Sequence, residues 1–333
     1  MIRTSTFLLV AAVVQAADIV DLPHHENQTV RREYLGDDTS IYWDLRLEPD
    51  GIRSGMMTAW PHAIGSVRVE QTTYEWAKDT ILVNAPGAPL LPTAKPLTED
   101  RIETTVTLRQ ALWTPFRWDA VLEVEGGALQ RDATYGDTKV ESNQQYLMDT
   151  RVAMLFPVYQ ERYAGLLLGG GVTLPTGDQE DWIKSHGTTG GLISARWSSQ
   201  LPLIPWTTVG LMAEYQFAAG SENIVYPNDK KQHATSDYSL MNLGGRLGFR
   251  IFRDLSLGAT ARYERARYDN IQIPGLATTV NEEVYRYRAA GYLTWQALPQ
   301  TFITGTASYS QGESTTDQES GFTFGIGLEA ALW

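Results

Sequence analysis

Charged side chains recur at alternate positions within apolar segments of this 333-residue chain. In residues 282–297, Tyr285, Tyr287 and Trp295 share one parity, whereas Arg286 and Arg288 lie on the other. A period of two predicts a β-strand with one apolar and one polar face. If such strands close into a barrel in a membrane, the charged face lines the interior. The candidate lumen residues are Arg46, Arg109, Arg151, Arg246, Arg250, Arg262, Arg286, Arg288, Asp44, Glu103, Asp119, Glu123, Asp149, Glu214 and Glu264.

These candidate lumen residues allow two chemical interpretations. They could line a water-filled channel that sorts small polar or ionic solutes. They could equally form salt bridges that fill a narrow barrel, since charges belong inside in either case. Arg246, Arg250, Arg286 and Arg288 form the strongest cluster, and a pore in which they face water unpaired should favour anions.

Other kinds of site chemistry find little support. The chain has no cysteine, which excludes disulfides, thiolate metal sites and a cysteine nucleophile. Its net charge of −12 argues against nucleic acid as a partner. Ser185 and His186 lie near Asp178, but no hydrolase motif surrounds them, and His24-His25 alone is a weak metal site. We therefore expect no catalytic residue, no metal and no cofactor.

The first residues predict export. Residues 1–17, MIRTSTFLLVAAVVQAA, combine a basic start, a short apolar core and small residues before a cleavage site, as in a secretory signal peptide. No later apolar run approaches the length of about 20 residues that a membrane-spanning helix needs. We expect a signal peptide over 1–17, a periplasmic segment over 18–38 and a barrel over 39–333.

The strands have an unusual length. Tyr285 and Trp295 lie ten residues apart on one apolar stripe, which on a tilted strand corresponds to roughly 25 Å, the height of the apolar band of outer-membrane barrels. A second such stripe consists of Tyr146, Met148, Thr150, Val152, Met154 and Phe156. Strands of 10–14 residues in this number are rare in soluble sheets, where about 5–6 is usual. The predicted strands are 41–48, 52–60, 63–76, 101–113, 117–127, 143–157, 162–175, 187–200, 205–219, 235–251, 255–269, 282–297, 301–311 and 320–333.

The connections alternate in length, as is typical of outer-membrane barrels. Short turns are predicted at 114–116, 157–161, 202–205, 253–254 and 298–300. Long polar loops are predicted at 131–143, 177–189, 220–236, 270–281 and 311–320. The fold class is therefore an all-β, transmembrane, antiparallel up-and-down barrel of about fourteen strands, with twelve as the alternative if 50–76 is partly irregular.

The last strand resembles the assembly signal of Gram-negative outer-membrane proteins. Phe322, Phe324, Ile326 and Leu328 alternate, and the chain ends in an aromatic residue. Trp333 departs from the usual signal because it falls on the opposite parity, which a β-bulge could reconcile. The resemblance implies two partners: the barrel-assembly machinery, and the lipid and lipopolysaccharide of the outer membrane.

A second resemblance rests on residues 168–178, LGGGVTLPTGD. This strand end is similar to the Pro-Thr-Gly-Asp motif of uncharacterised outer-membrane barrels, including those named for the meta-pathway of phenol degradation. The resemblance implies a transporter. Locally, Pro175 ends the strand and Gly177 permits a turn, so the motif is structural first.

We therefore expect an outer-membrane channel for passive passage of small solutes. The alternative is a closed structural or adhesion barrel with a side-chain-filled lumen, and an enzyme at the rim is a more distant third. Passage of hydrophobic solutes would need an apolar patch inside the barrel or a lateral opening, with Trp206, Met212 and Tyr292 as candidates.

Overall fold

The computed structural model describes most of the chain from Ala63 onward. The segments predicted as a signal peptide, a periplasmic segment and strands 41–48 and 52–60 lie outside the described residues. No helix in the described part is long and apolar enough to cross a membrane. The described residues are 63–78, 97–112, 120–135, 138–161, 164–177, 187–201, 204–225, 232–252, 254–272, 280–298, 301–314 and 317–332.

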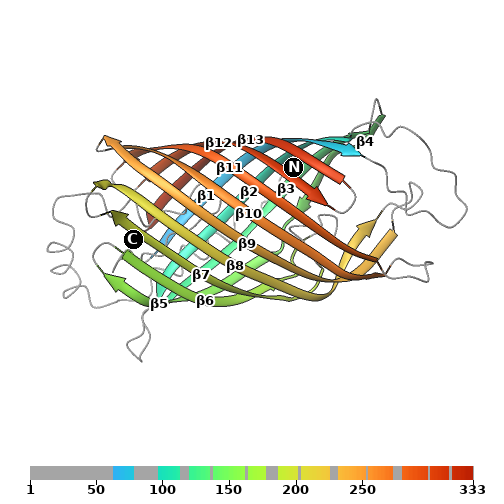
Figure 1. Ribbon diagram of the computed structural model, residues 1–333, viewed down its shortest axis with the longest axis horizontal. Helices are drawn as coiled ribbons and strands as arrows, with labels where there is room; N and C mark the ends of the chain where they lie inside the picture. The colour runs from blue at the N-terminus through green and yellow to red at the C-terminus, as the bar shows by residue number, and fades with distance from the viewer. Residues whose placement is uncertain are drawn as a thin grey trace, which may run out of the picture.

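Thirteen antiparallel strands account for nearly all of the described chain (Figure 1). Every one of the thirteen strands has at least ten residues, as the sequence pattern predicts. Their bounds are β1 Ala63–Lys78, β2 Leu97–Leu112, β3 Ala120–Tyr135, β4 Thr138–Leu147, β5 Thr150–Glu161, β6 Ala164–Leu174, β7 Gly190–Leu201, β8 Ile204–Val225, β9 Gln232–Phe252, β10 Leu255–Gln272, β11 Val280–Leu298, β12 Thr301–Ser314 and β13 Asp317–Leu332.

The sheet closes on itself into a barrel. Strands that are neighbours in the sequence pair with each other except β4 and β5, and β1 pairs with β13 from Ala63↔Leu332 to Lys78↔Asp317. Both β4 and β5 pair with β3, one above the other, so they share one place in the ring. The thirteen strands therefore make a barrel of twelve strand positions. Closure pairs the strands of the ring on both sides, which is how a barrel satisfies its backbone within a bilayer, and β4 extends beyond the ring with β3 as its partner.

The predicted count of fourteen strands is thus replaced by the alternative of twelve. The direct pairing of β1 with β13 makes Ala63 the start of the first strand of the ring, and no further strand intervenes. Three predicted long loops and one predicted short turn are also wrong. Residues 157–161 lie within β5, and residues 220–236 fall mostly in β8 and β9. Residues 131–143 belong largely to the β3–β4 hairpin, and residues 311–320 to the β12–β13 hairpin, because these strands extend beyond the apolar stripes used to place them.

A β-bulge separates β4 from β5, where one strand over 143–157 was predicted. From Glu125 to Ala128, β3 advances three residues, while its partner advances four, from Arg151 back to Leu147. The extra residue reverses the parity of the strand. Tyr146 and Met148 consequently face inward and are buried, whereas Met154 is exposed on the outside. The stripe from Tyr146 to Phe156 is therefore not one face.

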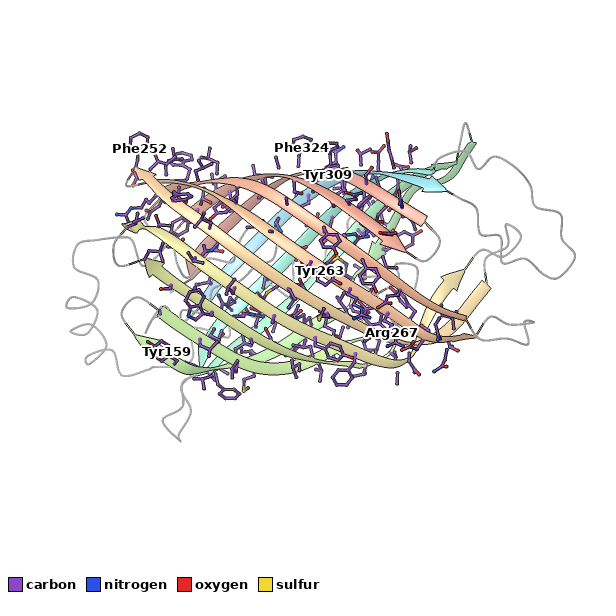
Figure 2. The ribbon with its side chains drawn as sticks, viewed as in Figure 1. Tyr159, Phe252, Tyr263, Arg267, Tyr309 and Phe324 are labelled. Carbon is purple, nitrogen blue, oxygen red and sulfur yellow. The ribbon has the colours of Figure 1, made fainter. Side chains whose placement is uncertain are left out.

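The two faces of the barrel differ in composition as predicted. Outward residues such as Leu293, Trp295, Phe324 and Ile326 are about half exposed or more. Figure 2 shows large outward side chains, including Phe252 and Tyr309, standing around the wall. The inner positions are mostly polar or charged and are buried.

The last strand has an unbroken register. β13 pairs with β1 and β12 without a shift, and its stripe of Phe322, Phe324, Ile326 and Leu328 faces outward. The bulge proposed to reconcile Trp333 with this stripe is absent from Asp317–Leu332, and Trp333 lies outside the described residues.

Candidate functional site: two charge networks on the inner wall

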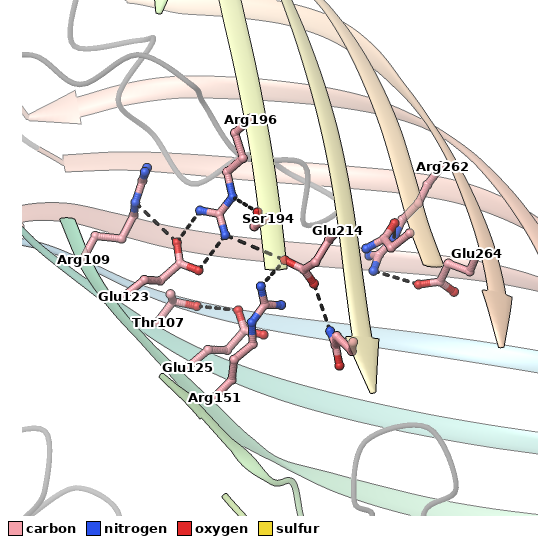
Figure 3. A network of polar contacts seen from close by, with 12 residues as sticks. Thr107, Arg109, Glu123, Glu125, Arg151, Ser194, Arg196, Glu214, Arg262 and Glu264 are labelled. Atoms are coloured by element: carbon pink, nitrogen blue, oxygen red, sulfur yellow. Dashed lines mark hydrogen bonds and ion pairs between the residues drawn. The ribbon is translucent and has the colours of Figure 1, made fainter. Parts of the chain in front are cut away.

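Arg196 is the centre of the first network. It projects inward from β7 and is fully buried. Its Nη1 and Nη2 donate to the two carboxylate oxygens of Glu123 at 2.8 and 3.0 Å, and its Nε donates to Ser194 Oγ at 3.1 Å (Figure 3). This bidentate geometry is the strongest form of an ion pair between side chains. Arg109 adds a second cation, with its Nε 3.5 Å from Glu123.

The network extends to Glu214 on β8. Arg151 of β5 contacts this carboxylate through Nη2, Gln216 donates to its other oxygen at 2.9 Å, and Arg196 Nη2 lies 3.9 Å away. The two long contacts cross the sheet in opposite directions. Arg196 reaches Glu123 over β6 and β5, and Arg151 reaches Glu214 over β6 and β7. The network therefore braces the five adjacent strands β3, β5, β6, β7 and β8 from inside.

Glycines of β6 leave the space for this bracing. Gly169 and Gly171 hold inward positions between the strands that carry the charged groups. A Cβ at either residue would lie 2.0 Å from a backbone oxygen of β5. The run Gly169–Gly171 thus marks a close approach of β6 to β5, which no residue with a side chain could adopt without moving the wall.

The second network lies on the opposite arc of the ring, from β9 through β13 to β1. Arg286 of β11 contacts Glu319 of β13 and lies 3.6 Å from Glu264 of β10. Arg262 continues it, with Nη2 2.7 Å from Glu264 and Nε donating to Asn242 at 2.9 Å. Cations and carboxylates therefore alternate along this arc.

Arg288 joins the same arc to the first strand. Its Nη2 lies 3.2 Å from Glu70 on β1, and its Nε donates to Ser308 at 2.9 Å. Inner glycines again lie below the crossing groups, since a Cβ at Gly325 would lie 3.0 Å from Glu70 Cγ and one at Gly312 would lie 2.5 Å from Glu319 Cγ.

Tyr74 of β1 connects this arc to a further charged group. Its ring lies between the guanidinium groups of Arg286 and Arg101, at 5.8 and 5.4 Å from the ring centroid. Arg101 and Arg131 both bind the fully buried Glu99, at 2.8 and 2.9 Å. The arc therefore ends at β2 and β3.

The two networks differ in their exposure to water. In the first, the side chains of Arg196, Glu123 and Glu214 are at most 2% exposed. In the second, those of Arg262, Glu264 and Arg288 are 18–21% exposed, whereas Glu319 is 3% exposed. Arg151 of the first network and Arg286 of the second are both 13% exposed. Charged side chains that are removed from water interact mainly with one another. Charged side chains that are partly hydrated can also interact with a solute in the lumen.

The predicted lumen residues that the structure describes face inward, but their roles divide. Arg109, Arg151 and Glu214 belong to the first network, and Arg262, Glu264, Arg286 and Arg288 to the second. Arg246 and Arg250 lie on the inner wall of β9, Arg246 with its side chain over Gly210. Arg46, Asp44 and Asp119 lie outside the described residues.

Two predictions about individual residues change. Asp149 lies at the bulge and accepts a hydrogen bond from Gly177 N at 2.9 Å, while Thr176 Oγ1 accepts one from Thr150 N at 2.8 Å. Asp149 therefore holds the Pro-Thr-Gly turn to the wall. The condition for an anion-selective cluster, unpaired arginines, is not met at Arg286 and Arg288, since both have carboxylate partners.

Four central residues were missing from the sequence prediction: Arg196, Glu70, Glu99 and Glu319. Arg196 had a readable signal, because Ser194, Arg196 and Ser198 alternate with Ile193, Ala195 and Trp197. The roles of Glu70 and Glu319 depend on the closure of β13 against β1, which no local pattern reveals.

An apolar cluster also lines part of the inner wall. Tyr238 and Leu240 of β9 pack with Tyr268 and Ile271 of β10, and the two tyrosine rings lie 5.2 Å apart. This cluster is nearer the ends of these strands that carry the longer loops. It supplies the apolar interior patch that passage of hydrophobic solutes would require. Met212 and Tyr292, two of the predicted candidates, are buried on the inner wall elsewhere, and the side chain of Trp206 lies outside the described residues.

In the described part of the chain, no group of three or more histidine, aspartate or glutamate residues could hold a metal ion. Ser185 and His186 lie outside that part.

Solved structures that are similar to this chain include barrels of bacterial outer membranes. The COG4313 outer membrane channel from Pseudomonas putida F1 is 13% identical and superposes with a TM-score of 0.59, covering 86% of this chain and 99% of that one. The two proteins share the fold of a closed antiparallel β-barrel.

More distant structures include the transport unit of the autotransporter AIDA-I from Escherichia coli, 9% identical with a TM-score of 0.47, covering 88% of this chain and 98% of that one. The NanC porin is 12% identical with a TM-score of 0.40, covering 80% and 100%. No family model matches the sequence, and no curated protein matches it.

Proposed function

We propose that the protein is an outer-membrane channel through which small polar or ionic solutes pass without a cofactor. The observation that carries the proposal is the uneven hydration of the inner wall. The centre of the first network, Arg196, Glu123 and Glu214, is dry and braces the barrel, whereas the partly hydrated Arg262, Glu264 and Arg288 line the path of the solute. Arginine side chains donate hydrogen bonds and glutamate side chains accept them. An alternation of the two can therefore replace the hydration water of a polar or ionic solute as it passes.

The same proposal includes location and assembly. Residues 1–17 direct export, and the outward stripe of β13 is offered to the barrel-assembly machinery. The end with the short turns faces the periplasm, and the end with the longer loops faces outward, as in other barrels of this class.

The test is single-channel conductance of the purified protein in a planar bilayer with a salt gradient. Stepwise conductance is expected. Glu264→Gln removes a carboxylate from the path and should shift the reversal potential towards anions, and Arg288→Gln should shift it towards cations. Glu214→Gln, in the dry network, is the matched control and should leave the reversal potential unchanged.

Two results would contradict the proposal. A silent membrane, with the folded state confirmed by heat-modifiable gel mobility, would indicate the closed structural barrel instead. A reversal-potential shift for Glu214→Gln as large as that for Glu264→Gln would show that the solute path is not confined to the arc from β9 to β1.

A second candidate function is passage of solutes with an apolar part, which the Tyr238–Ile271 cluster favours. A small aromatic carboxylate should then block the ion current more strongly than acetate. Tyr268→Ala should abolish the difference, and Tyr309→Ala, on the outer face, should retain it.

A further inference from the structure

The outer face of β10 and β11 carries a cluster of tyrosine and arginine side chains. Tyr263 lies opposite Tyr287, and Arg265 lies opposite Tyr285. The ring centroid of Tyr263 is 5.0 Å from that of Tyr287 and 6.4 Å from that of Tyr285, and the Arg265 guanidinium lies 5.6 Å above the Tyr285 ring. Figure 2 shows Tyr263 near the middle of the barrel's length and Arg267 nearer the loop end.

The cluster marks the upper edge of the lipid-facing belt. Towards the short-turn end, the outward residues of the same strands are apolar, with Leu257, Leu293 and Trp295 about half exposed. Tyrosine is the residue type that lines the membrane–water interface of such barrels. Arg265 and Arg267 therefore lie at the height of lipid headgroups in the outer leaflet.

Both arginines are positioned for a second partner. Arg265 contacts Glu283 through Nε, and Arg267 contacts Asp269 through Nε at 3.0 Å. The two side chains are nevertheless 43% and 54% exposed. An arginine held by its Nε has further N–H groups, and the planar guanidinium matches the oxygens of a phosphate.

The order of charges along the wall favours an anion that arrives from the belt. Above the tyrosines comes Arg265, opposite Tyr285, and then Arg267, opposite Glu283. Asp269 follows two residues farther out. A headgroup anchored by acyl chains in the belt therefore meets Arg265 first, and then Arg267 at the level of Glu283, before it reaches Asp269.

We propose that Arg265 and Arg267 bind a phosphate of an outer-leaflet glycolipid of the lipid A type, with the tyrosine cluster against the first carbons of its acyl chains. The position at the belt edge selects a lipid headgroup over free phosphate, because the surface below is already covered by acyl chains. The inference rests on the proposed orientation in the outer membrane, but not on conduction.

The test is binding of lipid A to the folded barrel in a neutral detergent, followed by native mass spectrometry. Bisphosphorylated lipid A should bind, and R265Q/R267Q should weaken its affinity by about tenfold. R262Q removes a guanidinium from the inner face of the same strand and should bind as the unmodified protein does. Dephosphorylated lipid A should bind the unmodified protein about tenfold more weakly, and inorganic phosphate alone should not bind measurably.

Equal affinity of the unmodified protein and R265Q/R267Q for bisphosphorylated lipid A would overturn the proposal, as would tight binding of inorganic phosphate alone. Heat-modifiable gel mobility confirms that each variant is folded. If R265Q/R267Q does not fold, R265K/R267K keeps the charge without the fork and should bind with intermediate affinity. Conductance of R265Q/R267Q should equal that of the unmodified protein, which separates this inference from the proposed channel.

Discussion

Arg196 shows how a single buried side chain can hold several strands of this barrel together. Its charge is compensated by Glu123 and, at longer distance, by Glu214. Because removing one member of a buried ion pair strands the other, Arg196→Met should destabilise the folded barrel by about 3 kcal/mol. Urea titration in lipid vesicles, read by heat-modifiable gel mobility, measures the change.

The double variant Arg196→Met/Glu123→Leu provides the control for this reading. It removes both charges, so it should recover part of the loss, since apolar replacement of a complete buried pair is often neutral. A double variant that costs the sum of the two single variants would show that the side chains do not act as a pair.

Asp149 provides the opposite case, a predicted pore residue with a structural role. Asp149→Ala removes the acceptor of the Gly177 N–H and should cost about 1 kcal/mol of stability. The reversal potential in a salt gradient should remain that of the unmodified protein. A selectivity shift would instead return Asp149 to the solute path.

At the scale of the element, β6 is the strand that allows the wall to be braced. Gly171→Ala should destabilise the barrel by about 2 kcal/mol or more, because its Cβ would overlap the backbone of β5 and one of the two strands must move. Gly305→Ala is the matched control, because nothing lies within 4 Å of a Cβ there. Equal folded fractions for the two variants in vesicles would contradict the close approach.

The same scale shows how far sequence patterns can predict this fold. Period-two alternation placed Arg286, Arg262 and Arg109 on the inner face, because the two sides of a membrane barrel meet such different solvents. It failed at Met148–Asp149, where one extra residue inverts the parity while the residue types still alternate. Gly126 and Gly127 lie on β3 opposite that bulge. Which residues of β3 lie opposite it depends on the strand pairing, and the local sequence does not show this.

The pairing of charges was beyond sequence reasoning for the same reason. Arg288 and Glu70 are separated by 218 residues and meet only because β13 closes on β1. The choice between unpaired, anion-selecting arginines and salt-bridged arginines therefore depended on the ring order. Alternation predicted which residues face the lumen, and closure determined which of them neutralise one another.

At the scale of the whole molecule, adjacent residues of one strand face different surroundings, lipid outside the barrel and the polar interior inside it. Ala307 faces outward within the apolar belt, and Thr306 beside it faces inward. Ala307→Arg should cost about 2–4 kcal/mol, since a guanidinium near the bilayer midplane loses its water. Thr306→Arg places the same group in the polar interior, so it should largely retain the folded state.

The pair also tests the channel, because the two variants should differ in current as well as in stability. Thr306→Arg adds a cation beside the arc of Arg288 and Glu70, and it should shift the reversal potential towards anions. The surviving folded fraction of Ala307→Arg should keep the selectivity of the unmodified protein, because its added charge lies outside the lumen. Folding in vesicles and single-channel recordings on both variants provide the measurement. Equal folding losses for the two variants would contradict the assignment of inside and outside. A reversal-potential shift for Ala307→Arg alone would contradict it as well.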